Sequence, residues 1–159
     1  ADYARSGYDK GHMAPAADMK WSPDVMKESF YFSNMCPQHP QLNRRGWKNL
    51  EEKIRDWAIA DSAIIIICGP IINQSSRTIG KNKVAVPERF FKVALSPFVK
   101  PVRGIGFLFN NRQAVEPLST YAVTIDSIEK LTNMDFFSPL PDEIENEVEA
   151  NADYYQWPH

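Results

Sequence analysis

The sequence has no hydrophobic run long enough to cross a lipid bilayer. Its longest strongly apolar run, Ala63 to Cys68, is far shorter than the about 20 residues that a membrane-spanning helix needs. The chain also lacks repeats, low-complexity tracts and a long Gly/Ser linker, so we expect one domain over residues 1–159. The hydrophobic fraction of 43% and the charged fraction of 24% are those of an ordinary globular protein.

Cysteine is scarce, and the two that are present leave three interpretations open. Cys36 and Cys68 are compatible with one disulfide, with two free thiols or with a metal role, and they fix no redox compartment. An excess of positive charge is also absent, because the net charge is −2. The molecule as a whole is therefore not a basic nucleic-acid binder.

The charges are nevertheless unevenly distributed along the chain. Between residues 77 and 103 the only acid is Glu88, whereas residues 126–153 hold nine acids and a single base, Lys130. A basic face can attract phosphates, although by itself this pattern favours two ordinary solvated surfaces. The bases of the first stretch are Arg77, Lys81, Lys83, Arg89, Lys92, Lys100 and Arg103.

Proline is frequent, and its spread through the chain indicates many short elements rather than a helical bundle. A buried, β-branched strand is expected at Ala63–Cys68 and should end at Gly69-Pro70. Residue alternation predicts further extended segments over 8–14, 30–33, 83–95 and 104–109.

Helical periodicity is clearest over residues 41–60, where apolar residues recur between charged ones. Thr124 is expected to cap a helix that ends at Leu131, and Pro141 to start another that ends at Ala150. Early strands, one long helix, several strands and late helices together predict an α+β fold with an antiparallel sheet.

A first group of chemically capable side chains lies in Tyr8–Pro15, whose sequence is YDKGHMAP. His12 can take a proton from water near neutral pH. Gly11 permits a tight backbone turn that can bring Asp9, Lys10 and the imidazole around one point. A single histidine is more often structural than catalytic, so this group alone does not establish an active site.

A second group lies on the long predicted helix. Asn43, Trp47, Glu51 and Arg55 are spaced by four residues and would share one stripe of that helix. The oxygen of Asn43 suits a hard cation such as Mg²⁺, and the planar guanidinium of Arg55 suits a phosphate. An ordinary helix cap at Asn43 followed by an exposed Glu51–Arg55 pair is the simpler alternative.

The two groups stand within a longer series of motifs. These are Asp-Lys-Gly-His at 9–12, Ser-Asn-Met-x-Pro-Gln at 33–38, Leu-Asn at 42–43, Trp-x-x-Leu-Glu-x-x-x-Arg at 47–55, Cys-Gly-Pro at 68–70, Val-Pro-x-x-Phe-Phe-Lys-Val at 86–93, Gly-Phe-Leu-Phe at 106–109 and Val-Thr-Ile-Asp-x-Ile-Glu at 123–129. In this order they resemble the DNA/RNA non-specific endonuclease family of the ββα-metal superfamily, over roughly residues 3 to 148.

The resemblance implies a fold and an activity. The fold would be a ββα-metal motif on a central antiparallel sheet flanked by helices, with the family's N-terminal strands missing from this chain. The activity would be a magnesium-dependent, sugar-non-specific endonuclease that hydrolyses phosphodiester bonds of DNA and RNA with little sequence preference and leaves 5′-phosphates. Mn²⁺ is expected to substitute for Mg²⁺.

The resemblance also implies roles for individual residues. His12 would be the general base that activates water, and Asn43 the only direct protein ligand to the metal. Glu51 would organise water around the metal, and Asn34 would help to orient the site. The phosphate-binding residues would be Lys10 and Arg55, with Asp9 as a structural support.

Two departures from the family pattern limit these expectations. Lys10 stands where the family usually has arginine, and a lysine supplies a point charge instead of a two-pronged clamp. The chain is also N-terminally short relative to the family, so a homodimer or a complementing N-terminal segment is an expected partner, besides DNA and RNA. A catalytically weakened member that mainly binds nucleic acid is the alternative within the family.

Two expectations remain: the cellular location of the protein, and an alternative in which the chain belongs to a different class of protein. By resemblance the protein would be secreted or periplasmic, or organellar if eukaryotic, and without a membrane partner. The different class is a zinc-stabilised interaction module in which Cys36, His39 and His12 are ligands and Cys68 or His159 is the fourth.

Surface and core are expected to divide as follows. The acidic run at 142–149 should be a solvated helix face, and the aromatic residues near the C-terminus should pack on the domain or on a partner. The aromatic residues expected mostly in the core are Trp47, Trp57, Phe90, Phe91, Phe107 and Phe109.

Overall fold

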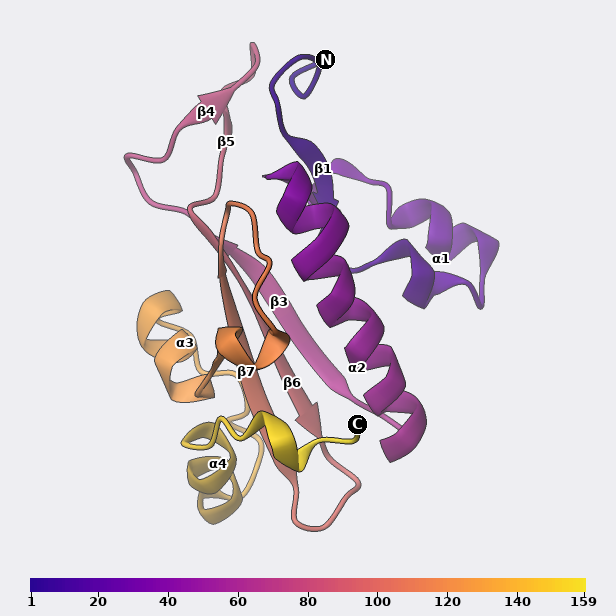
Figure 1. Ribbon diagram of the computed structural model, residues 1–159, viewed down its shortest axis with the longest axis vertical. Coiled ribbons are helices and arrows are strands. Elements are labelled where there is room, and N and C mark those ends of the chain that lie inside the picture. The colour runs from indigo at the N-terminus through magenta and orange to yellow at the C-terminus, as the bar shows by residue number, and fades with distance from the viewer.

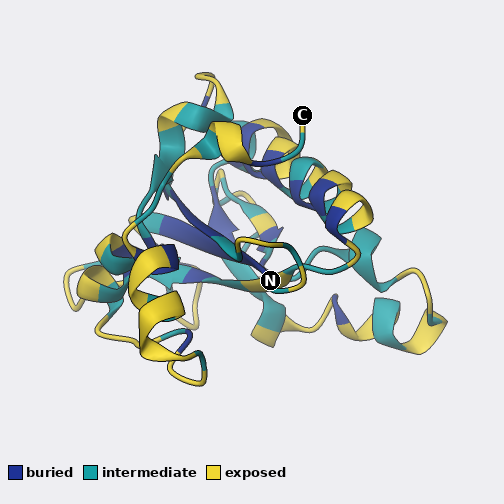
Figure 2. Cartoon of the chain, turned by 90° about the horizontal axis from the view of Figure 1, so that it is seen from below, coloured by how far each residue is buried: buried dark blue, intermediate teal, exposed yellow.

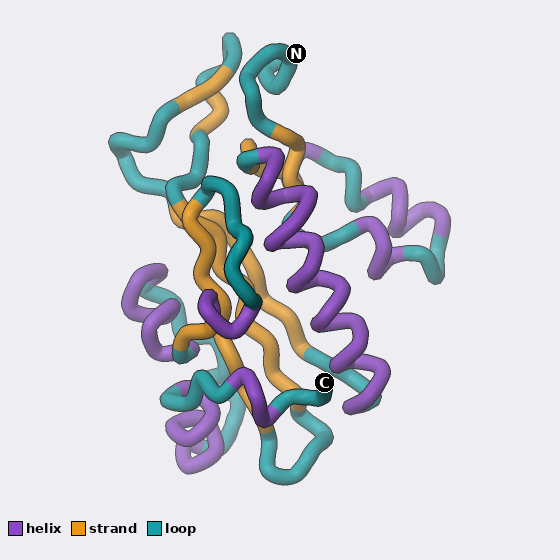
Figure 3. Tube along the Cα trace, viewed as in Figure 1, coloured by secondary structure: helices purple, strands orange, loops and turns teal.

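The computed structural model describes residues 1–159, and its centre is a four-stranded antiparallel sheet (Figure 1). The strand order is β3 (Ile65–Ile71), β6 (Arg89–Ser96), β7 (Arg103–Asn110) and β8 (Ala122–Val123). Figure 3 separates these strands from the helices and loops around them. The expected α+β fold with an antiparallel sheet is confirmed.

Strand β6 is buried on both faces because helices cover the sheet from both sides. Phe90 and Ala94 belong to the apolar cluster that packs against α2 (Lys48–Asp61). Their neighbours Phe91 and Val93 point to the opposite face and belong to a second apolar cluster. Figure 2 shows the buried residues of the sheet and of α2 facing each other.

Two short helices, α3 (Ile125–Thr132) and α4 (Asp142–Glu149), cover the second face of the sheet. They approach β7 closely because that strand presents glycines to them. A Cβ atom on Gly106 would lie 2.6 Å from the side chain of Ile128, so a larger residue would push α3 away. Thr124 caps α3 by accepting a hydrogen bond from the backbone of Ser127, as its position predicts.

A separate two-stranded ribbon precedes the sheet and leads into the long helix. Strands β1 (Asp9–His12) and β2 (Met35–Gln38) pair antiparallel, with His12 opposite Met35. A π-helical turn at Leu42–Trp47 follows and continues directly into α2. The ribbon and the helix together form the predicted ββα arrangement.

The remaining elements are short. Helix α1 (Pro23–Glu28) and two 3₁₀ turns (Ala16–Met19, Phe32–Asn34) lie between β1 and β2, and β4 (Thr78–Ile79) pairs with β5 (Val84–Ala85). Further 3₁₀ turns lie at Leu118–Tyr121 and Tyr154–Gln156. None of the helices is both long and apolar enough to cross a membrane.

Three predicted segments need correction. Residues 30–33 form turns, and the strand lies instead at Met35–Gln38. The segment 83–95 is divided, because β5 ends at Ala85 and β6 begins at Arg89. The strand expected at 63–68 runs on through Gly69-Pro70 to Ile71.

That last strand is not buried as expected, because β3 forms the edge of the sheet. Ile65 and Ile66 are exposed. Pro70 has no N–H group to donate, and it is tolerated because β3 pairs with a neighbouring strand on one side only. The predicted helices at 41–60, 125–131 and 141–150 are confirmed within one or two residues. The aromatic residues assigned to the core are all buried.

Two of the three C-terminal aromatic residues, Tyr154 and Trp157, pack on the domain itself, whereas Tyr155 is exposed. Trp157 lies with its ring centroid 4.5 Å from that of Trp57 on α2, and the Trp57 indole donates a 2.8 Å hydrogen bond to the carbonyl of Pro158. The tail therefore closes the end of the core beneath α2.

We expect Trp157→Ala to lower the free energy of unfolding by about 3 kcal/mol, because the side chain is 2% exposed and its removal leaves a cavity against Trp57. Tyr155→Ala is the matched control, since Tyr155 is 70% exposed and its loss should cost less than about 0.5 kcal/mol. Urea denaturation of the three proteins measures the difference. Equal midpoints for the two variants would contradict the packing of the tail.

Candidate active site

His12 ends strand β1 at the point where the ribbon meets the long helix. The indole nitrogen of Trp47 donates a 3.3 Å hydrogen bond to the carbonyl oxygen of His12. Trp47 itself is buried, because it lies in the core against Phe90 and Phe109. The last residue of the strand is thus fixed to the core through a backbone atom, which leaves its imidazole free.

The imidazole ring of His12 packs against an aromatic neighbour, and its Nε2 atom takes no part in that contact. Its ring stands edge-on to Phe30, with centroids 4.9 Å apart. The Nε2 atom is buried and has no hydrogen-bond partner. An unpaired buried polar atom is costly, so a water molecule, an ion or a substrate atom beside Nε2 would supply the missing partner.

Asn34 fixes the backbone just after His12 through hydrogen bonds of its side chain and its carbonyl group. Its side-chain oxygen accepts a 2.9 Å hydrogen bond from the amide of Ala14, and its amide nitrogen donates to the carbonyl oxygens of Ala14 and Ser29. The amide of Met13 donates to the Asn34 carbonyl oxygen at 2.9 Å. These four bonds hold the chain on both sides of the turn.

Asn43 lies in the π-helical turn, and its amide nitrogen donates a 2.9 Å hydrogen bond to Asp9. Asp9 also accepts two 2.8 Å hydrogen bonds from the guanidinium of Arg44. Burial opposes ionisation of Asp9, but the bonds from Arg44 and Asn43 prevail and lower its pKa. A charged Asp9 therefore orients the amide of Asn43, as the expected structural support would.

Glu51 lies one turn beyond Trp47 on α2, and it is largely buried. Burial raises the pKa of Glu51 to about 7, against the opposing positive charges of Lys92 and Arg55. The ammonium of Lys92 lies 3.8 Å from the Glu51 carboxylate and 4.4 Å from the centre of the Trp47 ring. The carboxyl group can therefore change its protonation state near neutral pH.

The two side chains expected to bind phosphate are engaged with neighbours. Arg55 forms a 2.8 Å ion pair with Asp18 in the segment between the ribbon strands. The ammonium of Lys10 lies 5.4 Å from the ring centre of Phe32 and 6.0 Å from that of Tyr3. Both cations remain partly or fully exposed, so a phosphate can still approach them.

Two contributors to the site were missing from the sequence-based prediction. Arg44 neutralises Asp9, and Lys92 supplies a buried cation beneath Glu51. Lys92 was expected among the solvated basic residues, yet it is only 2% exposed. Its position between Phe91 and Val93, in a strand whose neighbours alternate between two covered faces, is the signal that indicates its burial.

The geometry fits a hard cation at Asn43 and does not fit the zinc module. Because the Asn43 amide nitrogen is bound to Asp9, its oxygen points elsewhere and accepts no hydrogen bond. Both cysteine thiols are free. The side chains of Cys36, His39 and His12 do not gather as potential metal ligands, since the groups that do so are all carboxylates between Asp126 and Glu149.

A pocket of about 500 Å³ lies beside the π-helical turn. Its wall includes the exposed bases Arg44, Arg45 and Lys48, against a single acid, Glu116. Arg44 is paired with Asp9 and Lys48 with Glu52, whereas Arg45 forms no ion pair. Phosphate groups would be attracted to Arg45.

Comparison with known proteins agrees with this geometry. A model of the family described as DNA/RNA non-specific endonuclease matches residues 1–143. Mitochondrial endonuclease G from Homo sapiens is 36% identical over an alignment of 149 positions, and the match covers 86% of this chain and 50% of that protein. Mitochondrial nuclease 1 from Schizosaccharomyces pombe is 35% identical and is matched over 88% of this chain and 49% of its own length.

The fold is also similar to a solved structure, that of the complex of EndoG with EndoGI described as an inhibition mechanism. The TM-score is 0.83 at 30% sequence identity, and the match covers 89% of this chain and 64% of the other. The chain spans about half the length of the curated relatives that it matches.

Replacing Glu51 by glutamine should change how stability depends on pH. The pKa of Glu51 is about 7 in the fold and near 4.5 when unperturbed, so its stabilising contribution is complete below about pH 4.5 and is lost as the pH rises through 7. Glu51→Gln should therefore gain free energy of unfolding relative to the wild type over that window.

Urea denaturation at a series of pH values, in EDTA, measures this difference. The exposed neighbour Glu52 provides the control, since Glu52→Gln should differ from the wild type by an amount that does not vary with pH in this way. A difference between Glu51→Gln and the wild type that stays constant from pH 4.5 to 7 would show that burial of Glu51 does not favour its protonated form.

Proposed function

The chain belongs to the DNA/RNA non-specific endonuclease family, and from this premise we propose that it is a sugar-non-specific endonuclease that hydrolyses phosphodiester bonds of DNA and RNA. The observation that carries the proposal is the environment of His12. Its Nε2 atom is buried and unpartnered at the junction of the ribbon with the long helix, where Asn43 offers a free oxygen. The names of the relatives, which include endonuclease G and nucleases, support the same activity.

We assign the role of general base to His12. A neutral imidazole accepts the proton of a water molecule as that water attacks the phosphorus atom. The hydrogen bond from the Trp47 indole to the His12 carbonyl, and the hydrogen bond from the Ala14 amide to Asn34, hold the backbone on both sides of the ring during this transfer. The bond between phosphorus and the 3′-oxygen breaks, and the 3′-oxygen takes up a proton from water, so the products carry a 5′-phosphate and a 3′-hydroxyl.

Asn43 would be the protein's direct ligand to Mg²⁺, with Mn²⁺ as a substitute. Its oxygen is oriented by the hydrogen bond between its amide nitrogen and Asp9. When bound, a divalent ion supplies charge neutralisation at a phosphate oxygen and at the leaving 3′-oxygen. A hard cation of this kind prefers neutral and anionic oxygen ligands, which this corner of the protein presents.

Glu51 would hold nearby water molecules, and Lys92 would position the Glu51 carboxylate. Its carboxylate accepts hydrogen bonds from water, and the buried Lys92 ammonium favours the ionised form that can do so. Arg55 and Lys10 would contact substrate phosphates after exchanging their present partners. The exposed bases beside the π-helical turn would extend that contact along the strand.

These contacts would explain a lack of sequence preference. Phosphate and sugar groups are the same at every nucleotide, so residues that bind them carry no information about the base. The proposed substrates are therefore both DNA and RNA.

Location and partners are proposed on similar grounds. Several relatives are mitochondrial nucleases, which supports an organellar location. A homodimer or a complementing N-terminal segment would find a free sheet edge at β3. An edge strand with exposed isoleucines is a surface to which another strand can pair.

Plasmid degradation with Mg²⁺, against an EDTA control, tests the activity, and His12→Ala tests the mechanism. The variant should lose cleavage by about 10²–10⁴-fold, because general-base help of this size disappears. Its circular dichroism spectrum and its affinity for DNA should stay unchanged. His159→Ala, an exposed histidine elsewhere, should cleave normally.

Two results would overturn this assignment. Full activity in His12→Ala would remove the proposed base. DNA binding without any metal-dependent cleavage by the wild type would instead identify a weakened family member that mainly binds nucleic acid.

Asn43→Ala should raise the magnesium concentration needed for half-maximal cleavage, or abolish turnover, because it removes the proposed ligand oxygen. Asn49→Ala is the matched control, since Asn49 is an exposed asparagine on the same helix. The measurement is a titration of cleavage rate with MgCl₂. An unchanged titration in Asn43→Ala would exclude that side chain as the ligand.

A further inference from the structure

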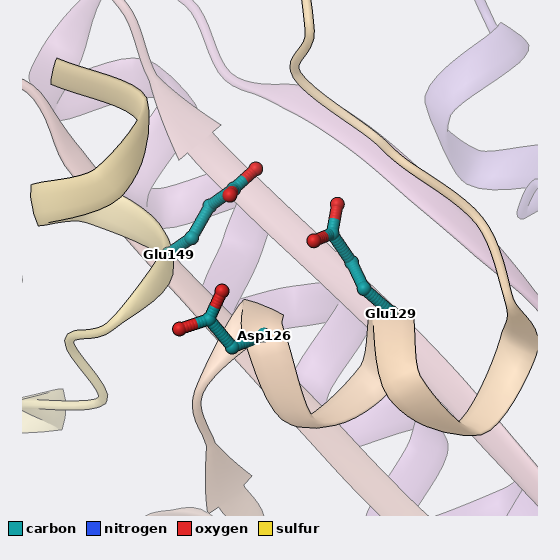
Figure 4. Close-up of side chains that lie close together, drawn as sticks. All are labelled: Asp126, Glu129 and Glu149. Carbon is teal, nitrogen blue, oxygen red and sulfur yellow. The ribbon is translucent and has the colours of Figure 1, made fainter. Parts of the chain in front are cut away.

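Carboxylates gather on the side of the sheet that faces away from α2. Asp126 and Glu129 lie one turn apart on α3, and Glu149 ends α4, which packs beside it. Figure 4 shows the three carboxylates pointing into one space between the two helices. One oxygen of each lies within 4.8 Å of the others.

Glu149 is the unusual member of this group. The residue is only 6% exposed, and its Oε1 atom is buried without a hydrogen-bond partner. Glu129 accepts a 2.7 Å hydrogen bond from the amide of Phe136, and that bond keeps its carboxylate in place. A buried carboxylate oxygen with no donor is costly unless a cation or a proton occupies the space beside it.

No positive side chain neutralises these acids. None of the ion pairs of the structure involves them. Asp135 and Glu145 add two more carboxylates, whose oxygens also lie within 4.8 Å of one belonging to Glu149. Burial, followed by repulsion from Glu129 and the other acids, raises the pKa of Glu149 to about 7.

We propose that Asp126, Glu129 and Glu149 bind a calcium ion. Ca²⁺ takes carboxylate oxygens at about 2.3–2.6 Å, so oxygens bound to one ion lie up to about 5 Å apart, and the oxygens of this group lie within 4.8 Å of one another. Mg²⁺ demands near-ideal octahedral geometry and keeps several of its waters, so a group made of several carboxylates suits Ca²⁺ better.

The charge balance favours the same conclusion. A divalent cation replaces mutual repulsion among the carboxylates with attraction, and it gives the buried Glu149 oxygen a partner. The ion would join α3 to α4 and so hold the last helix on the sheet. Asp135 and Glu145, at the more exposed end, would attract the ion and raise its local concentration.

This site is separate from the candidate active site, because the sheet lies between α2 and these helices. The test can therefore use the Asn43→Ala variant as the background, in which the proposed active-site ligand is removed. The experiment is isothermal titration of the chelator-treated protein with CaCl₂, together with melting curves at increasing CaCl₂ concentration. It needs no nuclease activity, so its outcome is independent of the proposed function.

We expect saturable binding of one Ca²⁺ per chain and a melting temperature that rises with CaCl₂, since a ligand that binds only the folded state stabilises it. Equal concentrations of MgCl₂ should give a smaller rise. Glu149→Gln should weaken Ca²⁺ binding by about ten-fold or more, because calcium affinity depends on the number of charged ligands. Without calcium, the same variant should melt at or above the temperature of its parent, because one repelling charge is gone.

Glu143→Gln is the matched control on the same helix, with an exposed carboxylate outside both groups, and it should bind Ca²⁺ like its parent. If titration with CaCl₂ gives no saturable heat of binding and the melting temperature does not rise, the proposal is overturned. Sharing of protons among the carboxylates would then be what stabilises the group. Equal binding by Glu149→Gln and its parent would overturn the proposal as well, since the ion would then lie elsewhere.

Discussion

The whole candidate site depends on the docking of a short ribbon against the beginning of a long helix. The Trp47 indole donates to the His12 carbonyl, and the Asn43 amide and the Arg44 guanidinium donate to Asp9. The first contact anchors the end of β1 to a side chain that is itself sealed in the core. The contacts at Asp9 connect the beginning of the same strand to the first turn of the helix. The proposed general base and the proposed metal ligand, which come from distant parts of the chain, are thereby joined to one unit.

Beneath this junction the protein accepts a buried charge. Lys92 is enclosed by the sheet and α2, where a lone ammonium would be strongly unfavourable. The face of the Trp47 ring and the carboxylate of Glu51 compensate for that burial. Burial raises the pKa of Glu51 to about 7, so the same arrangement keeps a carboxyl group that can gain or lose a proton near neutral pH. The burial that makes the Lys92–Glu51 pair costly for stability is thus also what raises the pKa of Glu51.

The sequence predicted the long helix, the capped helix at Thr124 and the buried aromatic residues, because each rests on a local pattern or on simple burial. It failed where local patterns mislead. Residues 30–33 alternate like a strand, but Asn34 binds backbone atoms across the loop, and the second strand of the ribbon, β2, begins only after Asn34. The burial of Lys92 and the pairing of Arg55 with Asp18 depend on elements that only the tertiary fold brings together.

The π-helical turn at Leu42–Trp47 has a consequence for how this protein can evolve. Removing one residue there would restore a regular helix, an apparent improvement, but it would rotate Asn43 by about 100° relative to everything that follows. Gly46 adds a second restriction, since a Cβ atom on it would lie 2.8 Å from the side chain of Ala114. The number of residues in this turn therefore sets the direction in which Asn43 faces, so a deletion or an insertion here would disturb the site without changing any of its side chains.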